Sequence, residues 1–346
     1  MMFRDAITNM QGYVPGEQPQ AGKFIKLNTN ENPYPPSPAV VEAIRQTAEN
    51  LVRYPDPLAT AFRIRAGEVL GVDPDWILCG NGSDDILTIL TRSLVDTGEM
   101  IRLPYPSYIL YKTLAEIQGA SSEQVPFNDD WSLPQAFGEG HDKLKLVFLP
   151  NPNSPTGTVI SGEDILDLAN QLPCPVLVDE AYADFAEFNC IDLVKENPKI
   201  MVSRTLSKSY GLAGLRFGFL IAQPQMIAEF CKVKDSYNCD AISIAGATAA
   251  IGDQQWFNNN RNKVLETRQR LHDGLEKLGF DVIPSQANFV WCTHSSQPSK
   301  PIYEHLKDNR VLVRYMDYEG WSDGLRISVG TDEQIDACLS LIEMKV

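Results

Sequence analysis

Two stretches of the sequence decide its fold class: VLVDEAY at residues 176–182 and IMVSRTLSKSYGLAGLR at residues 200–216. Each opens with an uninterrupted apolar run, Val176–Val178 in the first and Ile200–Val202 in the second. Because no residue in these runs is suited to face water, each run is typical of a strand buried on both faces of a mostly parallel sheet. The polar residues that follow, among them Asp179 and Lys208, then lie at the carboxyl ends of strands, where open α/β sheets bind ligands.

The same alternation of short apolar runs and amphipathic helices continues on both sides of these stretches. Further strands are expected at Trp76–Cys79, Met100–Leu103, Leu144–Leu149 and Phe217–Ile221. Helices are expected at 37–53, Asp84–Val95, Ser107–Ile117, Gly162–Gln171 and Pro224–Lys234. This pattern predicts an α/β fold with a mostly parallel central sheet and helices on both of its faces.

After about residue 250 the pattern changes. A long charged helix at Asn258–Leu278 and a closing helix at Asp332–Met344 enclose four short strands: Phe280–Val282, Phe289–Cys292, Val311–Arg314 and Leu325–Val329. The sequence therefore predicts three parts: an irregular arm at 1–36, a large α/β domain at 37–250 and a smaller α+β domain at 251–346.

Composition excludes several classes of function. With 30 Lys and Arg against 45 Asp and Glu, the net charge of −15 makes the chain a poor general binder of nucleic acid or anionic membranes. No run of 18 apolar residues predicts a membrane span, and the first residues lack the apolar core of a signal peptide. Seven scattered cysteines without a CxxC pair, together with four histidines, favour a reduced, cytoplasmic protein without a metal site.

Two loops could bind a ligand. CGNGSDD at 79–85 joins a strand to a helix, whose first N–H groups could cradle an anion. The alternative is an ordinary turn in which Ser83 or Asp84 caps the helix. The rigid loop NPNSPTG at 151–157 follows a strand directly, and a ligand-binding loop and a plain turn are about equally supported. Neither GxGxxG nor a P-loop occurs, so nothing favours a dinucleotide or nucleotide.

Four charged residues are candidates for chemistry. Asp179 ends an apolar strand, so it could hold Mg²⁺ or a protonated ring nitrogen, or it could merely cap a helix. Lys208, among Ser, Thr and Gly, could form a Schiff base rather than lie solvated on the surface. Arg314 and Arg326, in strands that we expect to lie side by side, could bind a carboxylate or phosphate, although an ion pair to one of the many acids is the simpler alternative.

Taken together, the motifs resemble those of pyridoxal-phosphate (PLP) aminotransferases of fold type I, and most of all the histidinol-phosphate aminotransferase branch. The resemblance extends from residue 27 to residue 331. The motifs, in family order, are LNTNENPYPPSP (27–38), RYPD (53–56), GNGSDD (80–85), YPSY (105–108), NPNSPTG (151–157), VDEAY (178–182), SRTLSKSYGLAGLRFG (203–218), NFVW (288–291) and LRISVG (325–330).

The resemblance implies a role for each matching residue. Lys208 matches the lysine that forms the internal aldimine with PLP, Asp179 the acid at the pyridine nitrogen, and Tyr182 the phenol at the 3-oxygen. Asn153 or Ser154 would donate to the same oxygen, and Asn153 is favoured because its amide is the longer donor. The other cofactor positions are Tyr108, which stacks on the ring, and Gly82, Ser83, Asp84, Thr205, Ser207, Arg216 and, from the neighbouring subunit, Tyr54, all at the phosphate. The substrate positions are Arg314, Arg326 and Asn32.

The resemblance also implies the reaction. The expected substrates are histidinol phosphate and 2-oxoglutarate, or imidazole-acetol phosphate and glutamate in the biosynthetic direction, with Lys208 carrying a 1,3-proton shift. The expected assembly is a homodimer with shared active sites, in which the arm and the small domain exclude water. The alternatives are an aromatic amino-acid aminotransferase, a threonine-phosphate decarboxylase and, from another class, a non-enzymatic PLP-binding protein.

Overall fold

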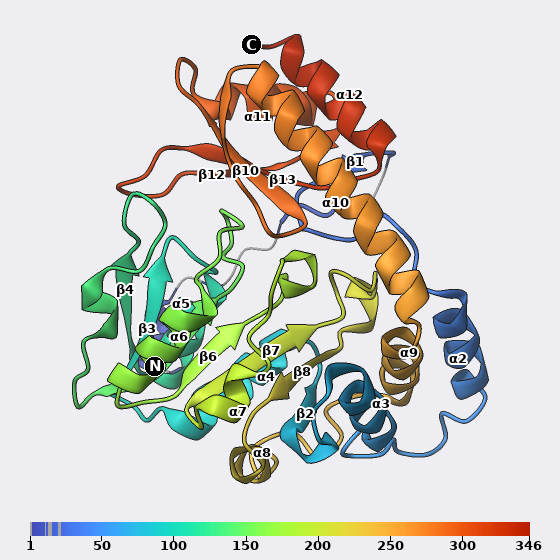
Figure 1. The fold of residues 1–346 in the computed structure, drawn as a ribbon, viewed down its shortest axis with the longest axis vertical. Helices are drawn as coiled ribbons and strands as arrows, with labels where there is room; N and C mark the ends of the chain where they lie inside the picture. The colour runs from blue at the N-terminus through green and yellow to red at the C-terminus, as the bar shows by residue number, and fades with distance from the viewer. Residues whose placement is uncertain (1, 11, 13–15, 20–21) are drawn as a thin grey trace.

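The computed structural model describes residues 2–10, 12, 16–19 and 22–346. Two sheets organise the chain (Figure 1). The larger sheet has seven strands in the order β2-β8-β7-β6-β5-β3-β4. Their bounds are β2 Ile77–Gly80, β3 Met100–Tyr105, β4 Ser121–Pro126, β5 Leu144–Pro150, β6 Val176–Asp179, β7 Ile200–Thr205 and β8 Gly218–Ile221.

The predicted mostly parallel sheet is confirmed. Strands β4, β3, β5, β6 and β7 run parallel, and β8 alone pairs antiparallel with both of its neighbours, β7 and β2. Successive side chains of the apolar strands enter different cores: Val176 and Val178 face one side of the sheet and Leu177 the other. The uninterrupted apolar runs follow from this two-sided burial.

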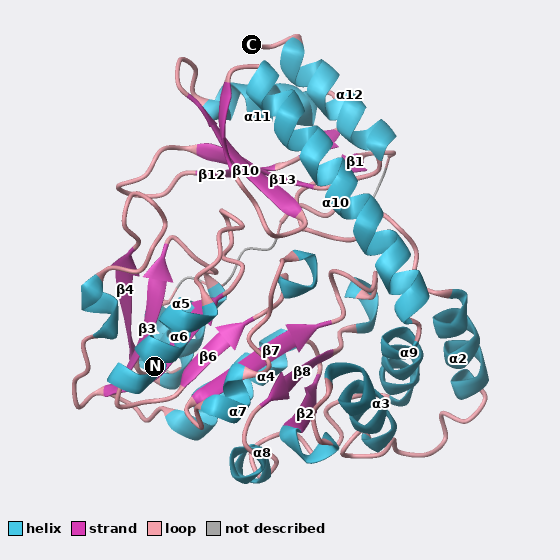
Figure 2. Cartoon of the chain, viewed as in Figure 1, coloured by secondary structure: helices cyan, strands magenta, loops and turns pink. Residues whose placement is uncertain are grey.

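Helices cover both faces of the larger sheet (Figure 2). The core shared with Leu177 contains residues of α4 (Ser83–Leu94), α5 (Leu110–Gln118) and α8 (Pro224–Phe230). The opposite core contains residues of α2 (Pro38–Ala48), α3 (Thr60–Leu70), α6 (Gly162–Gln171), α7 (Leu193–Glu196) and α9 (Ala241–Gly252). Ser37 caps α2 by accepting a hydrogen bond from the Ala39 N–H, as its sequence position predicts.

The smaller sheet is antiparallel, with the order β12-β13-β10-β9. Its strands are β9 (Phe280–Ile283), β10 (Phe289–His294), β12 (Arg314–Met316) and β13 (Gly324–Ser328). The helices α10 (Gln254–Lys277), α11 (Ser299–Asp308) and α12 (Asp332–Glu343) pack against it around a separate core. The arm joins this part of the chain, because β1 (Ile25–Lys26) pairs in parallel with β11 (Val311–Leu312).

Some elements differ from the sequence-based expectation. The first predicted helix ends at Ala48 rather than at residue 53. The strand β4 is polar and lacks an apolar run, and the helix α9, made mostly of small residues, lacks an amphipathic stripe, so neither element was expected from the sequence. The prediction of an irregular arm holds only in part: α1 (Asp5–Asn9) and β1 lie within it, while residues 1, 11, 13–15 and 20–21 lie outside the described chain. Among the described residues, no helix is long and apolar enough to cross a membrane.

Candidate active site

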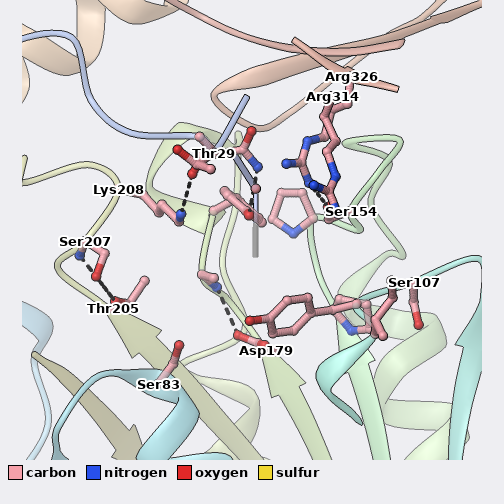
Figure 3. A pocket seen from close by; sticks show the side chains of 18 of the residues that line it. Thr29, Ser83, Ser107, Ser154, Asp179, Thr205, Ser207, Lys208, Arg314 and Arg326 are labelled. Carbon is pink, nitrogen blue, oxygen red and sulfur yellow. Dashed lines mark hydrogen bonds between the residues drawn. The ribbon is translucent and has the colours of Figure 1, made fainter. Parts of the chain in front are cut away.

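One cavity lies where the carboxyl ends of the parallel strands meet the smaller sheet and the arm (Figure 3). Three parts of the chain line it. The larger sheet and its loops contribute Ser83, Asp84, Ser107, Tyr108, Tyr111, Ser154, Asp179, Tyr182, Thr205, Ser207, Lys208 and Arg216. The arm contributes Gly16, Asn28, Thr29 and Asn30, and the smaller sheet contributes Arg314, Met316, Tyr318 and Arg326.

One end of the cavity is built to hold an anion. Helix α4 begins at Ser83, and its N-cap is Gly82, at φ +83°, so no side chain covers the first N–H groups of the helix. The expectation that Ser83 or Asp84 caps this helix is therefore wrong. A Cβ at Gly82 would lie 2.8 Å from Arg216 Nη2, so glycine is what allows the guanidinium to approach the helix end.

Hydroxyl groups complete this anion site. Thr205 Oγ1 donates to Ser207 Oγ at 3.0 Å, and Arg216 Nη1 lies 3.4 Å from the same Ser207 oxygen. Arg216 Nη2 also lies 3.4 Å from Asp84, which is long for an ion pair between half-exposed groups. Two hydroxyls, one guanidinium and the uncovered N–H groups of α4 thus converge on one end of the cavity.

Asp179 ends β6 in the floor of the cavity and is only 5% exposed. The strand register places it beside Ser203 of β7, whose hydroxyl donates to Oδ1 at 3.0 Å. Tyr111 donates to Oδ2 at 2.7 Å, and the Ala181 N–H donates to Oδ1 at 3.2 Å. Burial raises the pKa of Asp179, and the hydrogen bonds from Tyr111 and Ser203 oppose that rise. No Lys or Arg among the described residues forms an ion pair with it, so the carboxylate lacks a cation.

Lys208 lies on the loop after β7, and its amine faces the arm. Its Nζ donates to the Thr29 carbonyl at 3.1 Å and lies 5.8 Å from the centre of the Tyr182 ring. The Tyr182 hydroxyl in turn accepts a hydrogen bond from Asn30 Nδ2 at 3.0 Å. Lys208 is half-buried, lines the cavity and donates to the arm, so it is not the solvated surface lysine of the simpler alternative.

A buried ionic network supports the Lys208 loop from behind. Arg204 Nε lies 2.8 Å from the fully buried carboxylate of Glu180, and Arg204 also pairs with Asp184. The Ser209 hydroxyl donates to Asp184 as well. Because Ser209 follows Lys208 directly, these contacts fix the backbone that carries the amine.

The two arginines of the smaller sheet lie directly opposite each other. Arg314 on β12 and Arg326 on β13 are register partners, which confirms the predicted pairing of their strands. Arg326 donates to Ser154 Oγ at 2.9 Å and to the Asn28 carbonyl at 3.0 Å, and it lies over the Phe289 ring. No ion pair of Arg314 with a carboxylate occurs among the described residues. Like charges on facing positions repel, so this pair favours an anionic ligand between them.

Several predicted site residues do not line the cavity. Asn153 Nδ2 donates to the Pro106 carbonyl at 3.2 Å and to Thr156 at 3.1 Å, so its amide stabilises the loop instead. Asn32 donates to the Ser209 carbonyl at 2.9 Å and thereby holds the Lys208 loop. Tyr54 is 81% exposed and stacks on Tyr237 with ring centres 4.5 Å apart. Gly82 does not line the cavity itself, but it precedes the lining residue Ser83 and leaves room for the Arg216 guanidinium.

Other lining residues escaped the sequence analysis. Tyr111 lies in α5, three residues after Tyr108, which precedes that helix. In the helix expected at Ser107–Ile117 this spacing puts the two side chains on one face, and it could have indicated the place of Tyr111. Asn30, Met316 and Tyr318 carry no such signal, because their positions depend on how the arm and the β12–β13 loop fold over the larger sheet.

Comparisons with known proteins agree with this geometry. The family profile described as aminotransferase class I and II matches residues 22–342. The histidinol-phosphate aminotransferase of Rhodopirellula baltica is 63% identical over 99% of this chain and 95% of its own length, and that of Syntrophotalea carbinolica is 45% identical over 98% of both chains. Among solved structures, the histidinol-phosphate aminotransferase of Sinorhizobium meliloti in complex with pyridoxal 5′-phosphate is similar, with a TM-score of 0.90, 27% identity and coverage of 100% of this chain and 98% of the other. The expected family and fold are confirmed: this chain belongs to the class I and II aminotransferases and, within them, to the histidinol-phosphate aminotransferases.

Proposed function

We propose that this chain is a PLP-dependent aminotransferase that exchanges the amino group between histidinol phosphate and 2-oxoglutarate. The observation that carries the proposal is the facing pair Arg314 and Arg326 in the same cavity as Lys208 and Asp179. A substrate that ends in a dianionic phosphate neutralises two guanidinium groups, whereas a carboxylate neutralises only one.

The cavity fits pyridoxal phosphate group by group. The uncovered end of α4 with Arg216, Thr205 and Ser207 suits its phosphate. The buried carboxylate of Asp179, which lacks a cationic partner within the described chain, suits a protonated ring nitrogen. Tyr108 and Tyr182 also line the cavity, which supports a contact of Tyr108 with the ring and of Tyr182 with the 3-oxygen.

The residues of the chain would share the chemical work as follows. Pyridoxal phosphate, when bound, supplies an electron-withdrawing ring that acidifies the hydrogen on the amino-bearing carbon of the substrate. Asp179 stabilises the positive charge on the ring nitrogen, because a desolvated carboxylate attracts a cation strongly. Lys208 Nζ, hydrogen-bonded to the arm, is the group placed to accept and return that proton. The Asn30 amide fixes the orientation of the Tyr182 phenol.

Both substrates would bind at the two arginines. Arg326 is held in place by Ser154 and the Asn28 carbonyl, so it offers a fixed guanidinium to the α-carboxylate of glutamate or to the phosphate of histidinol phosphate. Arg314 adds the second guanidinium that the phosphate needs. Asn32 and Asn153 act through the loops that they hold, and they need not touch the substrate or the cofactor.

We further propose a homodimer in the cytosol. Tyr54 lies outside the cavity of its own chain, beside the exposed apolar residues Leu51, Val52 and Leu58, which suits a contact with a second copy. In that arrangement Tyr54 would reach the phosphate end of the neighbouring cavity. All seven cysteines lie within the described residues and are unpaired, which suits a reducing compartment.

A panel of amino donors tests the proposed reaction. The PLP-loaded protein is assayed with histidinol phosphate, phenylalanine, tyrosine and threonine phosphate, each with 2-oxoglutarate. We expect histidinol phosphate to give the highest kcat/KM. A preference for phenylalanine or tyrosine would assign an aromatic aminotransferase, and loss of CO₂ from threonine phosphate would assign a decarboxylase.

A further inference from the structure

We propose that Tyr111 is a positioning residue for the chemistry of the ring nitrogen: its hydroxyl keeps Asp179 ionised and oriented so that the pyridine stays protonated. The inference rests on the proposed function, since it assumes that pyridoxal phosphate occupies the cavity. Tyr111 lies on α5 and is fully buried, although its ring borders the cavity beside Tyr108.

The hydrogen bonds around Asp179 are distributed unevenly between its two oxygens. Oδ1 accepts from Ser203 at 3.0 Å and from the Ala181 N–H at 3.2 Å. Among the described residues, Oδ2 accepts a hydrogen bond from Tyr111 alone, at 2.7 Å, which is the shortest of the three. A carboxylate oxygen has two acceptor positions, so Oδ2 keeps one for the ring N–H of the cofactor. The phenol and the ring nitrogen would therefore share one oxygen.

The packing of Tyr111 leaves its hydroxyl little freedom. Its ring stacks on Phe148 of β5, with ring centres 4.9 Å apart, and meets the Tyr108 ring edge-on at 5.5 Å. Because Tyr108 also borders the cavity, one side chain contacts both the acid and the aromatic wall. Tyr111→Phe keeps these ring contacts and removes only the donor.

The charges around Asp179 show why the Tyr111 hydroxyl affects its ionisation. The ionisable groups that act on Asp179 are Asp84 on α4 and Tyr111 on α5. Tyr108, just before α5, and Tyr182, after β6, act in turn on Tyr111. Burial raises the pKa of Asp179 and Asp84 raises it further, while the Tyr111 hydroxyl is the strongest group that lowers it. Burial and the nearby Asp179 also raise the pKa of Tyr111 well above its ordinary value, so the phenol stays a donor.

Removal of the donor should move a proton. When two bases share one proton, the more basic one holds it. Without the Tyr111 hydroxyl the carboxylate becomes more basic, so the proton shifts from the ring nitrogen toward Asp179. The ring then loses its positive charge and withdraws electrons less strongly.

The visible absorbance of the PLP-loaded protein, titrated with pH, tests this inference. The midpoint of this titration is lower when the ring of the bound cofactor carries a positive charge. We expect Tyr111→Phe to raise the midpoint by about one pH unit, as for the loss of one hydrogen bond to a charged group. Ser203→Ala should give a smaller rise, because its hydroxyl is the weaker of the two that lower the pKa of Asp179.

Further measurements separate the outcomes. Affinity for PLP should fall only a few-fold in Tyr111→Phe, because the phosphate site is intact, while kcat falls much more. The control is Tyr303→Phe, which removes a phenol on α11 that packs on Tyr315 outside the cavity and should leave the titration unchanged. A Tyr111→Phe protein that melts earlier but titrates like the wild type would overturn the inference. A wild-type protein that binds PLP and titrates, yet transfers no amino group from histidinol phosphate, would overturn only the substrate assignment.

Discussion

Replacement of Arg314 by alanine should separate the two substrates of the proposed reaction. The phosphate of histidinol phosphate would lose one of two guanidinium partners, whereas the carboxylate of glutamate keeps Arg326 with its anchors Ser154 and Asn28. A hydrogen bond to a charged group contributes about 1.5–3 kcal/mol. Because Arg314 is half-buried rather than fully buried, we take about 2 kcal/mol, or roughly 30-fold in kcat/KM for histidinol phosphate.

Glutamate should lose less than about threefold, because its carboxylate would keep both donors of Arg326, which Ser154 and the Asn28 carbonyl hold in place. Removal of Arg314 also relieves its repulsion with Arg326, so the substrate-free variant should be more stable by roughly 0.5 kcal/mol, within the range for like charges on facing strands.

The assay is the steady-state rate with each amino donor, combined with thermal melts of the same preparations. Arg314→Lys keeps the charge but not the paired donors, so it should fall between the wild type and the alanine variant. Arg92→Ala, on the exposed side of α4, is the matched control and should change neither rate. Equal losses for both donors together with a lower melting temperature would refute this reasoning and make Arg314 a structural residue.

Three further predictions follow from the same cavity. Borohydride treatment of the PLP-loaded protein should attach the cofactor to Lys208, and peptide mapping that finds another lysine would contradict the proposed role. In the cofactor-free protein at neutral pH, Asp179→Asn should raise the melting temperature, because burial raises the pKa of Asp179 and makes its ionised form unfavourable; the gain over wild type should shrink as pH falls through that raised pKa, and melts from pH 5 to 8 would check the sign. A mixture of Tyr54→Phe and Lys208→Ala proteins should exceed the mean activity of the two parents, since hybrid dimers would contain one intact site each; strict additivity after subunit exchange would contradict the shared site.

The sequence predicted the strands of the larger sheet because each has a physical signal of its own. Val176–Val178 is apolar throughout since both of its faces are covered, and no other element is needed to recognise it. The edge strand β4, with the sequence SSEQVP, has only one neighbour and partly exposed side chains, so its pattern resembles a loop. Helix α9 is apolar on all sides since it packs between other helices, and therefore shows no amphipathic period.

The lining of the cavity, like the fold, could be predicted only in part. The place of Asp179 and Lys208 in the cavity was predictable because each is a reactive residue that follows an apolar run within one short motif. Asn28, Asn30 and Asn32 alternate along the arm, and the sequence does not show which of their side chains contacts the site. In the structure, Asn30 donates to Tyr182, 152 residues away, whereas Asn32 donates to the Ser209 carbonyl. Such pairings depend on the docking of the arm, which no local pattern encodes.

Three consecutive residues of the arm each form a hydrogen bond with a residue of the proposed site. The Asn28 carbonyl accepts from Arg326, the Thr29 carbonyl accepts from Lys208, and the Asn30 side chain donates to Tyr182. Leu27, just before them, is hydrogen-bonded through its backbone to β11 and β13, so the segment is attached to the smaller sheet. We therefore expect a ligand that displaces this sheet at the arginines to change the hydrogen bond that Lys208 makes as well. In the proposed reaction the arm would then contribute to catalysis as well as line the cavity.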